Sequence, residues 1–474
     1  MFAKRLLAVL VPATLVLPLA TPAHGGVSLI GIGQISGSDL SGLNGTLENG
    51  APANTLGGLG SAIAWAGGDT FLLTPDRGPN ASAWNSSVDN TTSWIPRFQT
   101  LNLGLGTTAF SAGSIATLTP VLNATTLLSS SAALNYGTAP VLTGSNGEHY
   151  FTGRSDAFAT GTSTNPDNAR LDLEGIRVAA DGKSVYISDE YGPYIYRFDR
   201  STGERTGVIT LPEKFAATTP AATEAAEIAA NTSGRVTNKG MEGLAITPDG
   251  KTLVGVMQSP LAQDGGTAAS TVRIVTIDLA TGKVTHEYAY QLDNIGTPAK
   301  PKYGTISEIV AINDHEFIID ERDGKGLGDD SKAVQKKLYT INLSGAQDVS
   351  NDTGAAALAG KAVTKTLFVD LVALLKANGY TDRTIPAKIE GLAFGPDVLV
   401  DGVLQHTLIV VNDNDFLDTV DVQGVPTANP NQFLVFGVSS DLIPAYDAQR
   451  IPEPATLALA ALGLSGFMLR RKRN

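Results

Sequence analysis

Short apolar segments rich in β-branched residues recur along this chain, and each is followed by a turn and a second apolar segment. Three copies are plain, at residues 173–190, 241–258 and 389–413. In the first two, Asp-Gly or Pro-Asp-Gly stands between the segments, at 181–182 and 248–250. Glycine supplies the positive φ that a tight turn between two strands needs. The pattern therefore predicts a series of β-hairpins.

Two further copies are looser, at residues 307–321 and 57–76. A second hairpin often follows the first, most clearly at 271–290, so each unit supplies four antiparallel strands. The glutamates at the start of successive units, beginning with Glu174, are 68, 66 and 82 residues apart. Units of about 67 residues divide the chain between its ends into about six, within the range that propellers use. We predict an all-β fold, a β-propeller of five to seven blades with six expected.

Three other segments complete this prediction. Residues 28–33 precede the first unit and are expected to add the outer strand of the last blade, which would cover two exposed strand edges. Residues 219–230 and 367–376 have helical character and are predicted to be short helical insertions between strands. The Gly/Ser/Thr/Asn-rich stretch 132–168 stays without assigned strands.

The amino-acid composition excludes several kinds of site and makes one class of partner improbable. The 474 residues carry 34 Lys and Arg against 46 Asp and Glu, a formal charge of −12, which disfavours nucleic acid as a partner. The chain has no cysteine, so a disulfide scaffold, a thiolate metal site and a cysteine nucleophile are all excluded. Any metal must be held by oxygen or histidine. No Gly-x-Ser-x-Gly motif or His-Glu-x-x-His spacing is present.

Both ends predict export. Residues 1–23 have Lys4 and Arg5, an apolar run and small residues at the end, the pattern of a secretory signal peptide. Residues 451–474 contain Ile-Pro-Glu-Pro, an apolar stretch and a terminal Arg-Arg-Lys-Arg cluster, a stop-transfer pattern. The middle, residues 25–450, is the propeller domain. We expect a monomer.

The C-terminal segment resembles the PEP-CTERM sorting signal of Gram-negative bacteria, with Pro452, Glu453 and Pro454 at the motif. This resemblance implies passage across the inner membrane, a transient stay there through a C-terminal transmembrane helix, and cutting near Pro454 by an exosortase. It also implies a location at the cell surface or in the extracellular matrix.

Acidic residues concentrate where a propeller would bring them together. Inner strands line the channel, so the glutamates at their starts form a ring, and a hairpin returns the acids at the ends of the second strands to the same face. Repulsion between such carboxylates favours a bound cation, and calcium takes six to eight oxygen ligands without Cys or His. The predicted metal ligands are Glu174, Glu242, Glu308, Glu390, Asp189, Glu190, Asp320, Glu321, Asp413 and Asp415.

Basic residues are interleaved with these acids and would hold an anionic, phosphate-like substrate. The predicted substrate-binding residues are Asp76, Arg77, Arg170, Lys239, Arg322 and Lys388. A structural alternative stays open for each glutamate, because a repeated Glu-Gly can bind backbone N–H groups of the neighbouring blade and simply hold the fold together.

A set of segments resembles the bacterial phytase-like family, also described as having esterase-like activity: GGDTFLLTPDRGPN, LDLEGIRVAADGKSVYISDEYGPYIYRFD, GMEGLAITPDGKTLVGVMQSPL and KIEGLAFGPD. The resemblance implies a secreted propeller with calcium-dependent phosphoester or ester hydrolase activity. The positions that match its recurring motifs are Arg77, Glu174, Asp189, Glu190, Glu242 and Glu390. The Asp-Ala-x-Asp-Asp-Pro-Ala-x-Trp stretch of alkaline propeller phytases is absent, so phytate is not singled out as the substrate.

The leading hypothesis is thus an exported calcium-dependent hydrolase of phosphate or other esters, acting on an anionic small molecule. The alternative is a non-catalytic calcium-binding propeller that meets a component of the extracellular matrix or biofilm. A third hypothesis is a lactonase-like propeller with its metal in the same channel.

Overall fold

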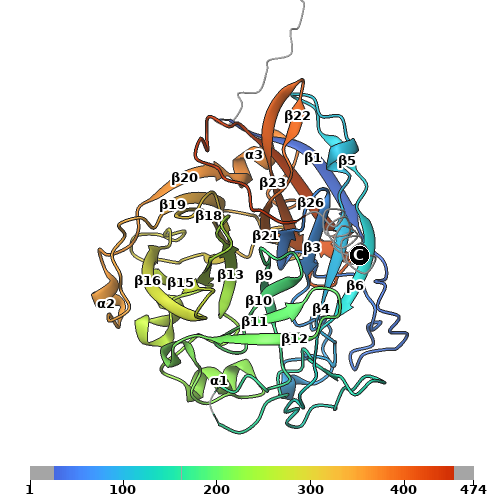
Figure 1. Cartoon of the computed structure of the whole chain (residues 1–474), viewed down its shortest axis with the longest axis vertical. Helices are drawn as coiled ribbons and strands as arrows, with labels where there is room; N and C mark the ends of the chain where they lie inside the picture. Colours follow the sequence, from blue (N-terminus) through green and yellow to red (C-terminus); the bar gives the residue numbers. More distant parts are fainter. Residues whose placement is uncertain (1–25, 162, 453–474) are drawn as a thin grey trace, which may run out of the picture.

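Five blades of β-sheet surround one axis in the computed structural model, which describes residues 26–161 and 163–452 (Figure 1). Four of the blades are four-stranded antiparallel sheets, and the fifth lies in a six-stranded sheet. The innermost strands contact one another in a closed ring, in the following order. They are β2 (Ala62–Trp65), β9 (Leu173–Val178), β13 (Met241–Ile246), β17 (Thr305–Ala311) and β21 (Lys388–Phe394). The predicted β-propeller is confirmed, with five blades in the described residues where the length arithmetic gave six. The arithmetic overcounts because residues 131–161 and 163–172, which the structure describes, contain only one two-residue strand and no blade.

Each blade runs outward from its inner strand. The first continues with β3 (Thr70–Thr74), β4 (Arg97–Asn102) and β6 (Val121–Leu127). The second continues with β10 (Ser184–Asp189), β11 (Tyr194–Asp199) and β12 (Arg205–Thr210). The third continues with β14 (Thr252–Met257), β15 (Thr271–Asp278) and β16 (Lys283–Gln291). The fourth continues with β18 (Glu316–Arg322), β19 (Lys336–Asn342) and β20 (Lys365–Asp370).

The fifth blade closes the ring with both ends of the propeller sequence. It consists of β21, β23 (Val403–Asp413), β26 (Asn431–Val438) and β1 (Val27–Ile35). β1 pairs antiparallel with β26, which confirms the predicted closing strand. β5 (Ala116–Leu118) from the first blade then pairs with β1 in parallel and covers its outer edge. This joint protects strand edges that would otherwise invite aggregation.

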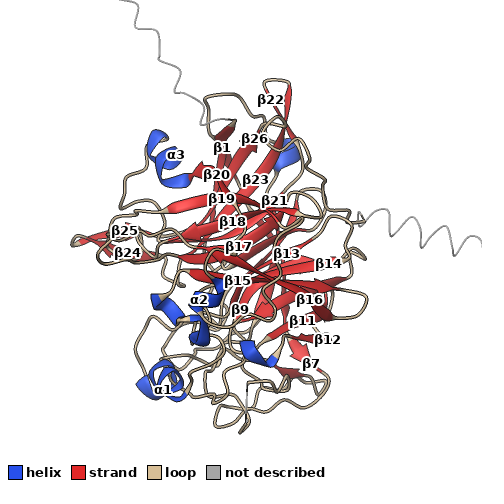
Figure 2. Cartoon of the chain, turned by 90° about the vertical axis from the view of Figure 1, so that its left-hand side faces the viewer, coloured by secondary structure: helices blue, strands red, loops and turns tan. Residues whose placement is uncertain are grey.

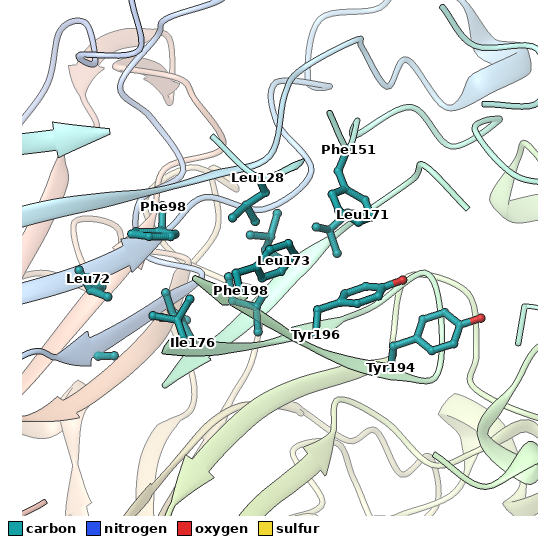
Figure 3. Close-up of a cluster of buried hydrophobic side chains, with 14 of the residues drawn as sticks. Leu72, Phe98, Leu128, Phe151, Leu171, Leu173, Ile176, Tyr194, Tyr196 and Phe198 are labelled. Carbon is teal, nitrogen blue, oxygen red and sulfur yellow. The ribbon is translucent and has the colours of Figure 1, made fainter. Parts of the chain in front are cut away.

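Apolar side chains fill the space between neighbouring blades. Five large clusters of buried hydrophobic residues each lie between two adjacent blades, and together they go around the ring. Figure 3 shows the cluster between the first and second blades, where Leu72 and Phe98 meet Ile176 and Phe198. Because a blade packs on both faces, inner strands are buried at nearly every position, as in β9. This explains why most residues of the inner strands are apolar, apart from the charged residues that face the channel.

The remaining elements are insertions (Figure 2). The helices are α1 (Glu224–Ala230), α2 (Ala355–Leu358) and α3 (Leu371–Ala377). The helix predicted for 367–376 begins only at Leu371, because residues 365–370 complete the fourth blade as β20. Short strands are β7 (Ser129–Ser130), β8 (His149–Tyr150), β22 (Val398–Val400), β24 (Thr419–Val422) and β25 (Val425–Ala428). Single-turn 3₁₀ helices lie at Ser86–Val88, Leu105–Thr107, Glu213–Phe215, Ala262–Asp264 and Gly266–Ala268.

Within residues 26–161 and 163–452, every helix is too short or too polar to cross a membrane. The predicted signal peptide and C-terminal transmembrane helix both lie outside the described residues.

One arginine fills the middle of the channel. Arg177 of β9 donates hydrogen bonds to the carbonyl oxygens of Ile63 (2.9 Å), Ile309 (2.8 Å) and Leu392 (3.4 Å), which belong to three other inner strands. Its guanidinium also lies 3.1 Å from an oxygen of Glu308. A buried charge needs such partners to offset its desolvation. Arg177 therefore ties four blades together and separates the two mouths of the channel.

Candidate functional site

A β-bulge aims a glutamate into one mouth of the channel in three blades. The pairing register shifts between Met241 and Gly243 in β13 and between Ile389 and Gly391 in β21. A bulge leaves one residue unpaired and redirects its side chain. The residues so released are Glu242 and Glu390, and an irregularity at the start of β9 does the same for Glu174. All three side chains line one cavity.

In the fourth blade the bulge lies one residue earlier than the alignment of the sequence repeats predicts. The shift in β17 lies between Ile306 and Glu308, so Ser307 takes the position that glutamate holds elsewhere. Glu308 instead accepts the N–H groups of Leu244 and Ile309, both at 2.9 Å, and contacts Arg177. Glu308 thus joins adjacent blades and does not line the cavity, as the structural alternative proposed for such glutamates.

The cavity at this mouth has a volume of about 380 Å³ and is strongly charged. Ordinary ligand pockets of this size are mostly apolar. Here eight carboxylic residues and four basic residues share the wall. The acids are Asp76, Asp172, Glu174, Glu190, Glu242, Glu390, Asp413 and Asp415, and the bases are Arg77, Lys239, Arg322 and Lys388. The charge density points to an ionic ligand.

Three buried acids form a compact cluster on one side of this cavity. Carboxylate oxygens of Asp172, Glu174 and Glu190 all lie within 4.8 Å of one another and could hold a metal ion. Glu242 stands next to them, only 2% exposed, and its Oε2 has no hydrogen-bond partner among the described residues. A buried, unpartnered carboxylate oxygen is costly unless a ligand satisfies it. The donor set is oxygen only, which suits calcium.

Arg77 borders the acidic cluster. Its backbone N–H and its Nη1 donate to the two oxygens of Asp172, each at 2.9 Å. Nη1 also donates to Oδ1 of Asn238, a residue in the left-handed region at φ +56°. The Arg77 side chain is therefore fixed at the rim of the cluster.

The opposite side of the cavity holds two cations paired with acids. Arg322 donates to Oε1 of Glu390. Lys388 Nζ lies 2.8 Å from Asp413 and 2.5 Å from Asp415. The acidic cluster comes from the second blade and its adjoining loops, whereas these two cations come from the fourth and fifth blades, which are not its neighbours in the ring.

A smaller chain of contacts joins the third blade to the acids. Gln258 donates to Glu242 Oε1 at 2.6 Å and accepts from Lys239 Nζ at 3.1 Å. This arrangement holds one oxygen of Glu242, while the other has no hydrogen-bond partner among the described residues.

Crowding changes the acidity of the carboxyl groups. Burial first, and then neighbouring carboxylates, raise the pKa of Glu174 and of Glu242 well above the ordinary value. Burial and Asp172 raise the pKa of Glu190 to about 7. Burial, Asp413 and Asp172 raise the pKa of Asp76 well above its usual range. A divalent cation among these groups would favour their charged forms and relieve the repulsion.

The pKa values of two basic side chains in the cavity are raised as well, which for a base favours the charged form. Burial alone would lower the pKa of Lys388, but Asp413 and Asp415 outweigh it and hold that pKa well above its ordinary value. Burial would likewise lower the pKa of Arg322, but nearby carboxylates, Glu390 first among them, outweigh burial and raise that pKa. Both side chains therefore stay charged and able to hold an anion.

Of the sixteen metal-binding and substrate-binding residues predicted from the sequence, the structure places eleven on the wall of this cavity. Besides Glu308, four lie elsewhere. Asp189 accepts the N–H groups of Asp172, Tyr191 and Gly192 and shapes the loop after β10. Arg170 lies 3.6 Å from Glu227, away from the cavity wall.

The other two predicted acids are in the fourth blade. Glu321 points to the outer side, where it accepts hydrogen bonds from Tyr290 (2.9 Å) and Lys365 (2.7 Å). Asp320 is buried at 1% exposure and does not line the cavity. Consecutive residues on a strand point to opposite faces, so both members of an acidic pair such as Asp320-Glu321 cannot reach one mouth.

Sequence reasoning missed several residues that line the cavity, among them Asp172, Asn238 and Gln258. Asp172 stands two positions before Glu174, and the strand period of two would have placed them on one side. Asn238 lies in a long loop between blades, where no sequence signal indicates that it meets Arg77.

Comparison with models of protein families identifies two matching segments in this chain. A family model described as esterase-like activity of phytase matches residues 54–416, which include every charged residue of the cavity. This chain belongs to the phytase-like family. A second model, the PEP-CTERM protein-sorting motif, matches residues 450–473. That motif indicates export and processing by an exosortase; Pro452 lies within the described residues, whereas Glu453 and Pro454 lie outside them.

Individual relatives of this phytase-like protein are distant. It is 34% identical over 197 residues to an uncharacterized secreted protein of Arthroderma benhamiae, a match that spans 36% of this chain and 37% of that protein. Among solved structures, the periplasmic gluconolactonase of Pseudomonas aeruginosa is 12% identical, with a TM-score of 0.33, covering 87% of this chain and 100% of that one. A putative 6-phosphogluconolactonase of Bacteroides uniformis is also 12% identical, with a TM-score of 0.29, covering 86% and 99%.

Proposed function

We propose that this phytase-like propeller is an exported, calcium-dependent hydrolase of phosphate esters or other anionic esters, which works at the cell surface or in the extracellular matrix. One observation carries the proposal: a single cavity places a buried acidic cluster opposite basic side chains that remain charged. Export is supported by the sorting motif and by the secreted relative.

The acidic cluster is where calcium would bind. Asp172, Glu174 and Glu190 offer carboxylate oxygens that lie close enough together, and Glu242 Oε2 is unpartnered beside them. When bound, calcium supplies a Lewis acid that polarises the ester and lowers the pKa of an attached water. Crowded carboxyl groups with raised pKa values suit this role, because a cation would restore their charged forms.

The chain's own cations would bind and orient the substrate. Arg322 and Lys388 lie across the cavity from the acidic cluster, each already paired with a carboxylate. An anionic ester oxygen would take the place of these carboxylates as a partner, in charge-assisted hydrogen bonds. Arg77 and Lys239 line the same wall and would fix the ester beside the metal. If the acids hold the metal and the bases hold the substrate, both signs of charge in the cavity are accounted for.

The test is hydrolysis by the purified protein of a panel of phosphomonoesters, phytate and carboxylic esters, with calcium and with a chelator. Chelation should abolish activity. Glu242→Gln removes the unpartnered carboxylate, and Arg77→Ala removes the cation at the rim, so each should lower kcat/KM by about 10-fold to 100-fold. Glu213→Gln, an exposed surface acid outside the cavity, is the matched control and should retain activity.

Calcium titration by calorimetry separates binding from catalysis. Glu242→Gln should weaken calcium binding, whereas Arg77→Ala should leave a measurable calcium isotherm. Hydrolysis that is indifferent to chelation and to both substitutions would refute the proposal. Calcium binding without hydrolysis of any ester in the panel would instead support a non-catalytic calcium-binding propeller.

A further inference from the structure

The C-terminal segment 443–452 crosses the mouth of the channel that lies opposite the charged cavity. We call it the strap. The inner strands begin at the charged cavity, with Glu174, Glu242 and Glu390, and they end at this far mouth. Strap residues Tyr446, Asp447 and Gln449 line the far mouth together with the strand ends, and a space of only about 40 Å³ remains there.

Specific contacts hold the strap to several blades. The Tyr446 ring packs on Phe394 and His406, with centroids 4.5 Å and 4.6 Å apart. The Asp447 N–H donates to the carbonyl oxygen of Ile312 at 2.9 Å. The strap thereby begins on the fourth and fifth blades.

The strap ends on the second blade. Gln449 Nε2 donates to the carbonyl oxygen of Val178 at 2.6 Å, and Ile451 is buried in the cluster between the first and second blades. Pro452 packs beside Gly182, in the turn between β9 and β10. The chain therefore stays attached to the far face up to the start of the sorting motif.

Almost no chain separates this attachment from the predicted membrane segment. The sorting motif matches from residue 450, and the apolar run occupies residues 455–469. A fully extended chain advances about 3.4 Å per residue, so three residues can separate the start of the run from Pro452 by about 10 Å at most. A propeller held so close to its membrane anchor cannot rotate freely.

We infer that the strap makes the far face of the propeller the membrane-facing side of the exported precursor, so that the charged cavity opens away from the lipid bilayer. The partner of this face is the bilayer in which the sorting segment sits. The inference does not depend on catalysis. It follows from the contacts of the strap, the short connection after Pro452 and the position of the cavity at the other end of the same strands.

The test uses the full-length precursor in vesicles of neutral phospholipid that carry nitroxide-labelled headgroups. Because the chain has no cysteine, one introduced cysteine can carry a fluorophore without background labelling. Lys251→Cys places it on the exposed turn between β13 and β14 at the far face. Ala81→Cys places it at an exposed position beside Asn80, which lines the charged cavity. Quenching at position 251 should exceed quenching at position 81 at least threefold.

A second variant tests the strap itself. Tyr446→Ala combined with Gln449→Ala removes its ring contacts and its hydrogen bond to Val178. The quenching difference between the two positions should then shrink towards equality, while circular dichroism shows an intact propeller. The inference would be overturned if, in the protein with an unaltered strap, quenching were equal at positions 81 and 251 or stronger at position 81. Each of these results is independent of whether the protein hydrolyses an ester.

Discussion

At the scale of single residues, the fold keeps several acids where water cannot reach them, and Asp320 is the clearest case outside the cavity. It is 1% exposed, and its Oδ1 has no hydrogen-bond partner among the described residues. Burial raises its pKa from the ordinary 3.8 to about 8, although Arg322 and Lys336 oppose this rise. The folded protein thus holds a proton on Asp320 that the unfolded chain releases.

Asp320→Asn should therefore change how stability depends on pH. The free energy of unfolding of the wild type should contain a contribution from Asp320 that is full below about pH 4 and is lost as the pH rises to about 8, because only the folded state stays protonated in this interval. Asparagine has no such proton. The stability of the variant relative to the wild type should rise between pH 4 and 8, by on the order of 1 kcal/mol per pH unit at most.

Denaturant titrations of both proteins at several pH values measure this difference. A constant difference between the two proteins from pH 4 to pH 8 would show that Asp320 ionises normally in the folded state.

At the scale of elements, the two residues of the Glu-Gly dipeptide at the bulged start of an inner strand have different roles. In β21 the glutamate reaches the cavity, and Gly391 lies against the inner strand of the first blade. A Cβ on Gly391 would stand 2.5 Å from Val411 Cγ2, and 3.1 Å from the Ala62 carbonyl carbon and the Ile63 nitrogen. The glycine therefore permits close contact between blades, and the neighbouring glutamate is left free for the ligand.

Gly391→Ala should lower the free energy of unfolding by about 1–3 kcal/mol, because the added methyl group overpacks a backbone contact that cannot easily move. Gly45→Ala is the matched control, since a Cβ there would meet no atom within 4 Å and Gly45 does not lie in the left-handed region. Chemical denaturation measures both. Equal stability of the two variants would contradict the packing argument.

At the scale of the whole molecule, the ring is held shut by pairing the N-terminal strand β1 with β26 near the C-terminus. Ile30 of β1 is 2% exposed and packs in the cluster between the fifth and first blades. Because every blade depends on two neighbours, opening this joint should expose a large apolar surface on both sides of it.

Ile30→Asp would place a charge in this cluster and should lower the free energy of unfolding by about 3 kcal/mol or more. Hydrogen exchange should show that β5 and β26 lose protection together, since they pair with β1 on its two sides. Ile115→Asp, at a site that is already 37% exposed, should have little effect. Loss of protection confined to β1 would indicate that the ring remains closed without it.

The repeat pattern predicted much of this architecture, because hairpins and their turns are encoded by neighbouring residues. The closing strand at residues 28–33 was predictable for the same reason, since an apolar strand without a local partner must find one elsewhere. The register at each blade start was not predictable. Ser307 and Glu308 show why, since a bulge shifted by one residue sends a glutamate to the neighbouring blade and not to the mouth.

The sequence by itself determined an exported all-β repeat protein without cysteine, with acids and bases set at recurring places in the repeat. Those features depend on composition, local pattern and terminal motifs. Only the tertiary structure decided which charges meet, because Asp172, Glu174 and Glu190 form a cluster through strand register, and Lys388 meets Asp413 across two strands. It also decided that the strap covers the far mouth, since contacts between distant segments follow from how the ring closes.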